Sequence, residues 1–581
     1  TKLLDKLPFY KTTAPSAINV FAEGAYLKPG HAPQIGKGSK GIINIDDFDG
    51  TQSGYDLRFP PISWAIASVP LNATDRNGNI LFPEATFNDS IISGRNRSKI
   101  GWYQIEPTLQ QYKGPNNPYS NDRVELSDPR VRQVYQREIF PQRTTGFGES
   151  LLTTFDLAYF PTDRGPYNYD AAPGSVNTNG KLNNPKTRWG GLMRSIDQPD
   201  FETANIEFIE FWMQDPFINY AAKGLTYDPN TAGGKLYFNL GNVSEDILKD
   251  GKRSYENGLP TPNAPSPVDN SNWGRVPINP VQVTNAFSND PNDRKYQDIG
   301  FDGLDDTAEV NKRQAYLAQL QGQVSAAAYQ RALVDPSTDN YHYYRGDDLD
   351  QTPGIGIIGR YKNYNNPEGN SPVASTSSIY SSAATLYPDA EDLNRDNTLN
   401  QTEEYFQYIV DIKHASQPEM SIGTNYIVDK KTVTINPVDG SSRPEIWYQF
   451  RIPIGQYNRK IGNIPDFKSI RFIRMFLTDF SDSVVMRFGE LQFTRNVWRK
   501  FPYRIDTSGI YTQLPNGSPT VFNQGAVNIE ENDKRSPLPY RTPTDIQRIQ
   551  TLSNNGVNLL QNEQALSLQF CELASKDARA V

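Results

Sequence analysis

The chain has 581 residues, of which 36% are hydrophobic and 12% aromatic, together with 42 Gly and 43 Pro. This aromatic content is too high for a disordered chain, and the many Gly and Pro residues favour short strands joined by turns over a helical bundle. A net charge of −8 argues against a nucleic-acid binder, which needs a basic surface. No apolar run is long enough for a membrane-spanning helix.

Composition predicts a mainly β fold class. We expect two or more β-sandwich domains, of jelly-roll or galactose-binding-like type, with a short helical insertion and long loops. The predicted segments, in chain order, are an extended arm (1–40), a first β-sandwich (41–258), a linker with a helical insertion (259–350), a second β-sandwich with a calcium loop (351–505), a connector (506–562) and the start of a third, truncated sandwich (563–581). The first residues carry no apolar signal-peptide core, so we expect a fragment or a mature product.

Two helices are predicted within the insertion. Asp306, followed three residues later by Glu309, has the spacing of a capping box, and apolar residues then recur at helical intervals to about Gly322. A second helical stretch covers residues 325–334 and ends before Asp335-Pro336.

A weak internal repeat links the two predicted sandwiches. Residues 206–213 align without gaps to residues 470–477, and both segments follow an Asp-Phe pair and precede another apolar segment. One residue in the shared pattern steps out of strict alternation, which predicts a bulge in a half-buried strand. We interpret the repeat as two sandwiches with similar central strands, the alternative being chance similarity between two aromatic strands.

The strongest chemical signal is segment 392–403, which fits the twelve-residue calcium loop. Oxygen-bearing side chains occupy positions 1, 3, 5 and 9, position 7 would offer its backbone carbonyl, and a Glu at position 12 can bind through both oxygens. The predicted ligands of a structural Ca²⁺ are Asp392, Asn394, Asp396, Thr398, Asn400 and Glu403.

The loop departs from the pattern at position 6, where Asn397 stands in place of the usual Gly. Asn is the residue that best tolerates a left-handed turn after Gly, so the departure is mild. A Tyr-Pro pair precedes the loop and a strand-like segment follows it, so no EF-hand helix pair is expected. A lone loop cannot open a helix pair, which favours a structural ion over a calcium sensor. The alternative is a solvated Asp/Asn turn.

Further acidic clusters give weaker signals. The segment from Asp298 to Asp306 is best explained as a turn followed by a helix cap, and a second metal site near Asp302 stays open. Glu207 and Glu210 are expected to face solvent on opposite faces of a strand, rather than to act as the facing carboxylates of a glycosidase.

Catalytic and cofactor-binding residues are not predicted. Residues 354–359 match GxGxxG by letter, but neither a strand before them nor a helix after them is expected, which argues against nucleotide binding. One cysteine and three scattered histidines supply little for a disulfide, a zinc site or a Ser-His-Asp triad. We expect buried positions for Cys571 and for Trp64, Trp102, Trp189 and Trp212, the alternative for the tryptophans being a sugar-stacking platform.

The chain resembles the SprA (Sov) family, very large outer-membrane proteins of the type IX secretion system of Bacteroidota. The matching stretches are spread over nearly the whole length: Glu23–His31, Ile45–Gly50, Ile206–Phe217, Asn239–Leu248, Tyr255–Pro260, Ile299–Leu304, the calcium loop with Tyr405–Tyr408, Trp447–Pro453, Ile470–Phe476, Glu563–Leu568 and Asp577–Ala580.

The resemblance implies a part in protein transport. SprA-like proteins form a giant β-barrel translocon that passes folded cargo proteins across the outer membrane, and some support gliding motility. They bind a smaller lateral-gate barrel (PorV-like) and a periplasmic plug protein. This sequence lacks a run of outward-apolar barrel strands, so we expect a segment attached to the rest of the translocon barrel, on the extracellular face of the cell outer membrane or, as second choice, on the periplasmic face.

These observations favour a non-enzymatic structural segment, an extracellular cap stiffened by calcium, with no nucleic-acid partner. The alternative is a calcium-stabilised carbohydrate-binding or adhesin module of a secreted bacterial protein, which would present coplanar exposed aromatics. An enzyme, most plausibly a glycosidase, is the third choice.

Overall fold

The computed structural model describes residues 40–45, 52–143, 150–278, 287–288, 290–370, 388–496, 498–501, 503–505, 512–514, 520–535, 539–543, 547–552, 558–575 and 577–581. The chain divides into two compact units. The larger comprises Asp46–Lys500, Gly525–Leu566 and Val581, and the smaller comprises Thr1–Ile45, Phe501–Gln524 and Ser567–Ala580.

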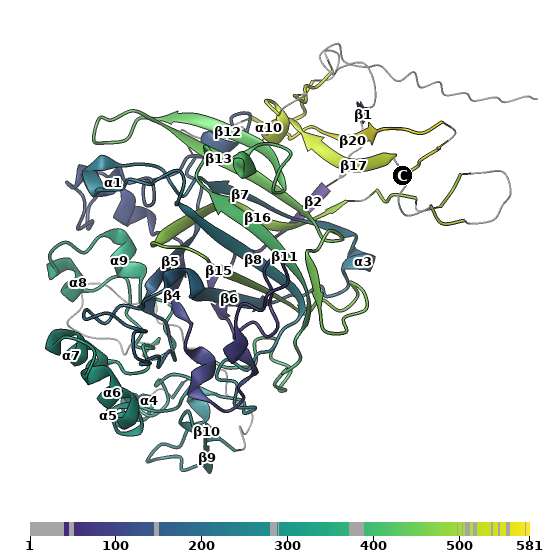
Figure 1. The fold of residues 1–581 in the computed structure, drawn as a ribbon. Coiled ribbons are helices and arrows are strands. Elements are labelled where there is room, and N and C mark those ends of the chain that lie inside the picture. Colours follow the sequence, from purple (N-terminus) through teal and green to yellow (C-terminus); the bar gives the residue numbers. More distant parts are fainter. Residues whose placement is uncertain are drawn as a thin grey trace, which may run out of the picture. The chain divides into compact units, whose positions relative to one another are not determined.

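Two antiparallel sheets dominate the larger unit (Figure 1). The six-stranded sheet has the order β14 (Arg459–Ile461), β11 (Glu404–Lys413), β8 (Gly233–Asn242), β15 (Phe472–Thr478), β6 (Trp189–Ser195), β3 (Ala65–Ile66). The seven-stranded sheet has the order β12 (Ile427–Ile435), β13 (Arg443–Pro453), β7 (Ile206–Gln214), β16 (Val484–Asn496), β5 (Phe155–Arg164), β4 (Ser98–Tyr103), with β2 (Gln52–Asp56) paired to β16. The predicted mainly β class is confirmed.

Each of the two sheets contains strands from both predicted sandwiches. β7 pairs with β13 on one side and with β16 on the other, and β8 pairs with β11 and β15. Segments 41–258 and 351–505 therefore do not form a sandwich each, because both sheets contain strands of both segments. The period-2 pattern shows which faces of a strand are buried, but not which strand lies beside it.

The internal repeat marks equivalent places in the two sheets. The first copy lies in β7 and the second overlaps β15, and each is an inner strand of its own sheet. The strand after each copy pairs with the other copy: β8 follows β7 and pairs with β15, whereas β16 follows β15 and pairs with β7. The predicted bulge is present in the first copy, where the register of β7 against β16 shifts beside Glu207, but not in the second, since β15 pairs with β6 and β8 in continuous register.

Aromatic side chains fill the space between the sheets. The Phe211 ring of β7 stacks on Phe450 of β13, with centroids 4.7 Å apart, and lies 5.7 Å from Phe238 of β8 in the other sheet. Such pairs add about 0.5–1.5 kcal/mol each beyond the burial of their area. The expectation of buried tryptophans is met, because at most 5% of each residue is exposed for Trp64, Trp102, Trp189 and Trp212.

The helical insertion forms α5 (Asp306–Lys312), α6 (Gln314–Gln321) and α7 (Ala326–Val334). The second predicted helix is confirmed as α7, whose N-cap Ser325 accepts a hydrogen bond from the Ala328 N–H. The first is divided at Arg313 into α5 and α6. The Arg313 guanidinium is buried, donates to the Trp273 carbonyl and lies 4.3 Å from the Tyr169 ring centroid, so its contacts fix the break.

The start of α5 differs from the predicted capping box. Asp305 is the N-cap, and its carboxylate accepts from the Ala308 N–H at 2.9 Å. Glu309 consequently lies one position beyond the capping site and is fully buried, where its carboxylate accepts from the Ser337 N–H. The shift of one residue turns this acid from the helix end into the protein interior.

The remaining α-helices and strands are short. In the larger unit they are α1 (Arg123–Leu126), α2 (Gln136–Ile139), α3 (Phe201–Ala204), β9 (Val268–Asn270), β10 (Arg275–Pro277), α4 (Pro291–Arg294), α8 (Asp347–Gln351), α9 (Ile357–Tyr361), α10 (Ile529–Asn532), β18 (Gln550–Leu552) and β19 (Asn558–Leu560).

A three-stranded sheet lies near the chain ends, in the order β1 (Lys40–Ile45), β20 (Gln564–Cys571), β17 (Val521–Asn528). The predicted connector thus contains strands and a helix, and the last predicted segment contributes β20. Cys571 is half-buried, not the core residue that the sequence predicts. The predicted arm lies outside the described residues, apart from Lys40.

A glycine in β8 lies where a side chain would meet the backbone of β11. A Cβ at Gly241 would lie 2.4 Å from the Glu404 carbonyl oxygen and 2.8 Å from the Tyr405 Cα, both backbone atoms of β11. We therefore expect Gly241→Ala to lower the free energy of unfolding by about 1–3 kcal/mol, measured by urea denaturation. Gly455→Ala is the control, since a Cβ there would meet no atom within 4 Å. An equal effect of the two substitutions would contradict the tight packing of β8 against β11.

Candidate metal centre

The predicted calcium loop leads into β11. Asp392 is buried at its beginning, and its carboxylate accepts from the N–H groups of Asp396 and Asn397 and from the Tyr255 hydroxyl, at 2.9–3.1 Å. Asn397 has a φ of +66°, a left-handed conformation. Position 1 of the loop is thus at its base, and position 6 has the turn that the pattern requires.

The middle of the loop is held by its own polar groups. The Asn394 side chain donates to Asp396 at 2.9 Å, and the Thr398 N–H donates to the same carboxylate at 2.8 Å. The Thr398 hydroxyl bond is the main cause that lowers the pKa of Asp396. Asn400 accepts from Arg471 at 3.2 Å through its side-chain oxygen. The side-chain oxygens predicted as ligands at Asn394, Asp396 and Asn400 therefore have protein partners in this conformation.

Glu403, the predicted bidentate ligand, contacts a cation of the sheet. Both of its carboxylate oxygens accept from the Arg474 guanidinium at 2.8 Å, and one also accepts from the Ser244 N–H. Arg474 of β15 is fully buried, and burial lowers its pKa, but the charge and hydrogen bonds of Glu403, together with Tyr405, outweigh burial and raise the pKa overall. Removing either partner would leave a buried charge, so this pair anchors the end of the loop to the six-stranded sheet.

Glu245 lies outside the loop in the sequence, but its side chain binds the loop. Its carboxylate accepts from the Leu393 N–H at 2.7 Å and from the Asn400 N–H at 3.2 Å. Burial, with a smaller contribution from the Asp392 charge, raises the pKa of Glu245 to about 7. Its only sequence signal is its position within the family-like stretch 239–248, because no spacing rule connects it to a loop so far along the chain.

A group of three acids lies next to the loop. Oxygen atoms of Asp246, Asp250 and Glu391 lie within 4.8 Å of one another. Backbone N–H groups bind these carboxylates: Glu391 accepts from Ile247, Leu248 and Ser254, Asp246 accepts from Asp250 and Gly251, and Asp250 accepts from Lys252. These acids fold the segment around residue 250, and their contacts do not themselves point to a metal ion.

The glycine-rich segment 354–359 differs locally from expectation, because the five-residue helix α9 begins at Ile357. The Glu125 carboxylate accepts from the Ile357 N–H at 2.6 Å. A carboxylate of the chain itself therefore occupies the place that a phosphate would take at a helix N-terminus.

The expectation that Glu210 faces solvent is wrong. Glu210 is 1% exposed, and its carboxylate pairs with Arg451 at 2.8 Å and accepts from Gln449 at 2.7 Å. The repeat explains this burial: Glu210 in the first copy corresponds to Arg474 in the second, and each pairs with an opposite charge. Glu210 shares a face of β7 with Trp212, and Ile139 and Phe140 pack against that tryptophan, so this face of the strand is covered and not open to solvent.

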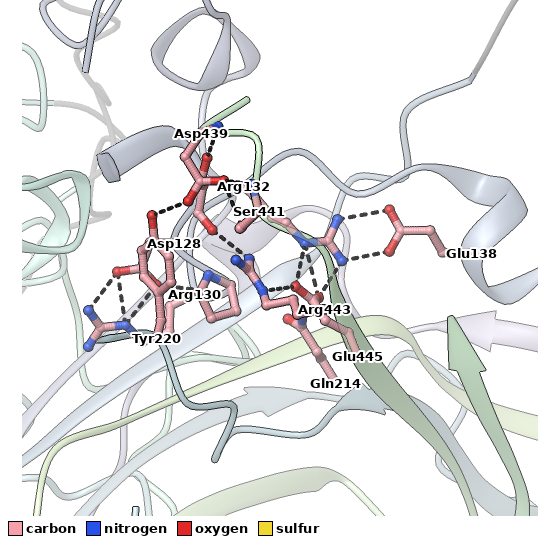
Figure 2. Close-up of polar contacts among 12 residues, drawn as sticks. Asp128, Arg130, Arg132, Glu138, Gln214, Tyr220, Asp439, Ser441, Arg443 and Glu445 are labelled. Atoms are coloured by element: carbon pink, nitrogen blue, oxygen red, sulfur yellow. Dashed lines mark hydrogen bonds and ion pairs between the residues drawn. The ribbon is translucent and has the colours of Figure 1, made fainter. Parts of the chain in front are cut away.

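An extended polar network binds the seven-stranded sheet to the segment around α1 and α2. Figure 2 shows Arg132 between Glu138 and Glu445, with nitrogen–oxygen distances of 2.7 and 2.5 Å. Glu445 of β13 also accepts from Gln214 of β7 and from Arg443. Arg132, Glu138 and Glu445 are all at most 4% exposed.

A pocket of about 290 Å³ lies beside α7, with charged residues in its lining. Asp163 pairs with Lys181 and Lys362, and the buried Lys99 donates to Asn366 at 2.8 Å. Burial lowers the pKa of Lys99 to about 8. The pairing of these groups is typical of a structural network.

The fold and these contacts define a mainly β protein with two large antiparallel sheets, in which the buried acids Glu210, Glu403 and Glu445 pair with guanidinium groups. Within the described residues, no helix is long and apolar enough to cross a membrane. Residues 315–581, a little under half of the chain, match the family model SprA_N, described as "Motility related/secretion protein". The match bears out the resemblance in the sequence, because residues 315–581 are similar to SprA-family proteins. No curated protein sequence matches the chain.

Proposed function

We propose that the chain is a non-enzymatic structural segment of a type IX secretion translocon, placed as an extracellular cap on the outer-membrane barrel. Its partners would be the rest of the barrel, a PorV-like lateral gate, the plug protein and folded cargo. The family match carries the proposal, since it indicates a motility and secretion protein. The fold adds support, because strands from segments far apart in the chain share both sheets and so form one sandwich.

The aromatic residues favour this function over carbohydrate binding. A sugar-stacking platform needs exposed, coplanar rings. The tryptophans proposed for such a platform are buried, as are Trp273 and Trp447, each at most 5% exposed. Structural packing therefore accounts for these side chains.

Recovery of the assembled translocon tests the proposal. An affinity tag inserted after Gly440, in the turn before β13, should recover the PorV-like barrel, the plug and cargo from detergent-solubilised outer membranes. A control tag on an unrelated outer-membrane protein should recover none of them. A tagged chain that purifies without these partners, while the purified chain binds a glycan array, would favour the adhesin and overturn the proposal.

We also propose that loop 392–403 binds a structural Ca²⁺. Asp392, Asn394, Asp396, Thr398 and Asn400 would supply oxygens, and Glu403 would join them only if it left Arg474. This competition favours weak binding, in the range of about 0.1–1 mM found in extracellular modules. At 10 mM calcium, such a site adds about 1–3 kcal/mol to the free energy of unfolding.

Thermal unfolding in chelator and in 10 mM calcium checks this prediction. Asp396→Asn should reduce the shift in unfolding midpoint that calcium causes. Asp75→Asn is the matched control, because Asp75 also receives hydrogen bonds from nearby residues in an exposed turn, from Asn77 and Asn79. An unchanged calcium shift in Asp396→Asn would remove the ion from the loop.

A further inference from the structure

Three buried acids from the helical insertion converge beneath α5. Asp302 precedes this helix, Glu309 lies on it and Asp339 follows α7. Oxygen atoms of the three carboxylates lie within 4.8 Å of one another, and at most 1% of each residue is exposed. Like charges at this separation repel strongly away from water, so the group needs protons or a cation.

The oxygens of this group are incompletely satisfied by the protein. Neither carboxylate oxygen of Asp339 accepts a hydrogen bond of good geometry, although the Tyr167 hydroxyl lies close to this residue, and Oε1 of Glu309 has no hydrogen-bond partner. The other Glu309 oxygen accepts from the Ser337 N–H, and Asp302 accepts from the Ser337 hydroxyl and the Leu304 N–H. Buried oxygens without donors, aimed at other acids, indicate a missing positive partner.

Arg313, the basic residue beside the group, already donates hydrogen bonds to backbone carbonyls. Arg313 comes within 3.9 Å of Asp302, but its guanidinium donates to the carbonyls of Asn272 and Trp273. The acids around Asp246 provide an internal contrast, because backbone N–H groups hold those carboxylates. The two groups have the same composition, but one carboxylate oxygen lacks a hydrogen-bond partner in the group around Asp246, Oδ2 of Asp250, whereas three lack one in the group beneath α5.

We propose that Asp302, Glu309 and Asp339 bind a divalent cation, most suitably Ca²⁺, in a site separate from loop 392–403. All three supply oxygen, the ligand that calcium prefers, and nitrogen or sulfur ligands for zinc are absent from the set. Waters or carbonyls would complete the six to eight oxygens that calcium takes. The ion would tie the start of α5 to the segment after α7.

The acid–base properties of the group are consistent with this site. Burial is the main cause that raises the pKa of Asp302 to about 6 and that of Glu309 to about 11, and neighbouring acids add to the rise for Glu309. Burial and the Asp302 charge also raise the pKa of Asp339. Without a cation, these carboxyl groups therefore hold more protons in the folded state than in the unfolded state, from about pH 4 up to their raised pKa values. The stability of the folded state consequently falls as pH rises through this range. Calcium binding would release these protons and reverse that trend.

Calorimetric titration of the full chelator-treated chain with calcium at pH 7.5 tests the proposal. We expect Asp339→Asn to remove one equivalent of bound calcium and its proton release, which is measured by repeating the titration in buffers of different ionisation enthalpy. Asp246→Asn, in the other acidic group, should keep the wild-type stoichiometry, because both Asp246 oxygens already accept hydrogen bonds from backbone N–H groups. Asp396→Asn, in the loop, should keep the proton-releasing equivalent, so the two sites fail or succeed separately.

Stability in chelator supplies a second readout. Asp339→Asn removes a carboxyl from the repelling group, so in chelator at pH 8 its unfolding midpoint should equal or exceed that of the wild type, whereas added calcium should raise the midpoint less than in the wild type. A variant that fails to fold in chelator would contradict the repulsion on which the site depends. A wild type without a proton-releasing equivalent, or an Asp339→Asn chain that binds calcium as the wild type does, would overturn the proposal.

Discussion

Arg132→Met is expected to lower the free energy of unfolding by about 3–5 kcal/mol, the usual cost of removing one partner of a buried ion pair. Arg132 is the shared partner of Glu138 and Glu445, and both carboxylates are buried. The substitution keeps most of the apolar stem but leaves Glu138 without its guanidinium. Urea denaturation, followed by tryptophan fluorescence, measures the change.

An exposed ion pair provides the control for this substitution. Arg76 pairs with Asp411 at 2.7 Å, but the Arg76 side chain is 42% exposed. Arg76→Met should therefore cost less than about 1 kcal/mol. If the two variants lost the same stability, the network around Glu445 would not anchor α2 to the seven-stranded sheet.

Two separate pieces of the chain, residues 52–258 and residues 388–500, are expected to remain unfolded when each is produced alone. The first piece contains β7 and β8 but lacks the strands that pair with both of their edges, β13 and β16 for β7, and β11 and β15 for β8. Each piece would thus expose long apolar strands with unpaired N–H and C=O groups. Hydrogen exchange should find no strongly protected amides in either piece.

The full chain is the control, in which amides of β7 and β8 should be the most protected. Mixing the two pieces during refolding should restore part of this protection, because each supplies the missing edges of the other. A cooperative unfolding transition in either piece alone would contradict the shared sheets and support the two separate sandwiches that the sequence suggests.

The local features of the fold could be predicted from the sequence because they depend on local chemistry. The Ser325 cap and the apolar spacing after it define α7, and Asn397 adopts the left-handed turn that its place in the loop requires. The repeat at 206–213 and 470–477 correctly identified two equivalent inner strands. Strand pairing could not be predicted, because alternation carries no information on the neighbour.

The acidic sites show the same limit. Spacing placed Asp392 and Asn397 correctly in the loop but could not show that Glu403 contacts Arg474 or that Glu245 enters from another strand end. A cap one residue earlier than expected, at Asp305, moved Glu309 from the helix end into a buried acidic group. A shift of one residue thus decides whether an acidic side chain caps a helix, pairs with a basic residue or lies buried without a positive partner.

Surface labelling of intact cells tests the proposed location on the outer face most directly. In a Cys571→Ser background, Ser442→Cys places a thiol on an exposed turn before β13. A membrane-impermeant maleimide should label this cysteine on intact cells as completely as after permeabilisation of the outer membrane. Labelling only after permeabilisation would place this face in the periplasm and contradict the extracellular cap.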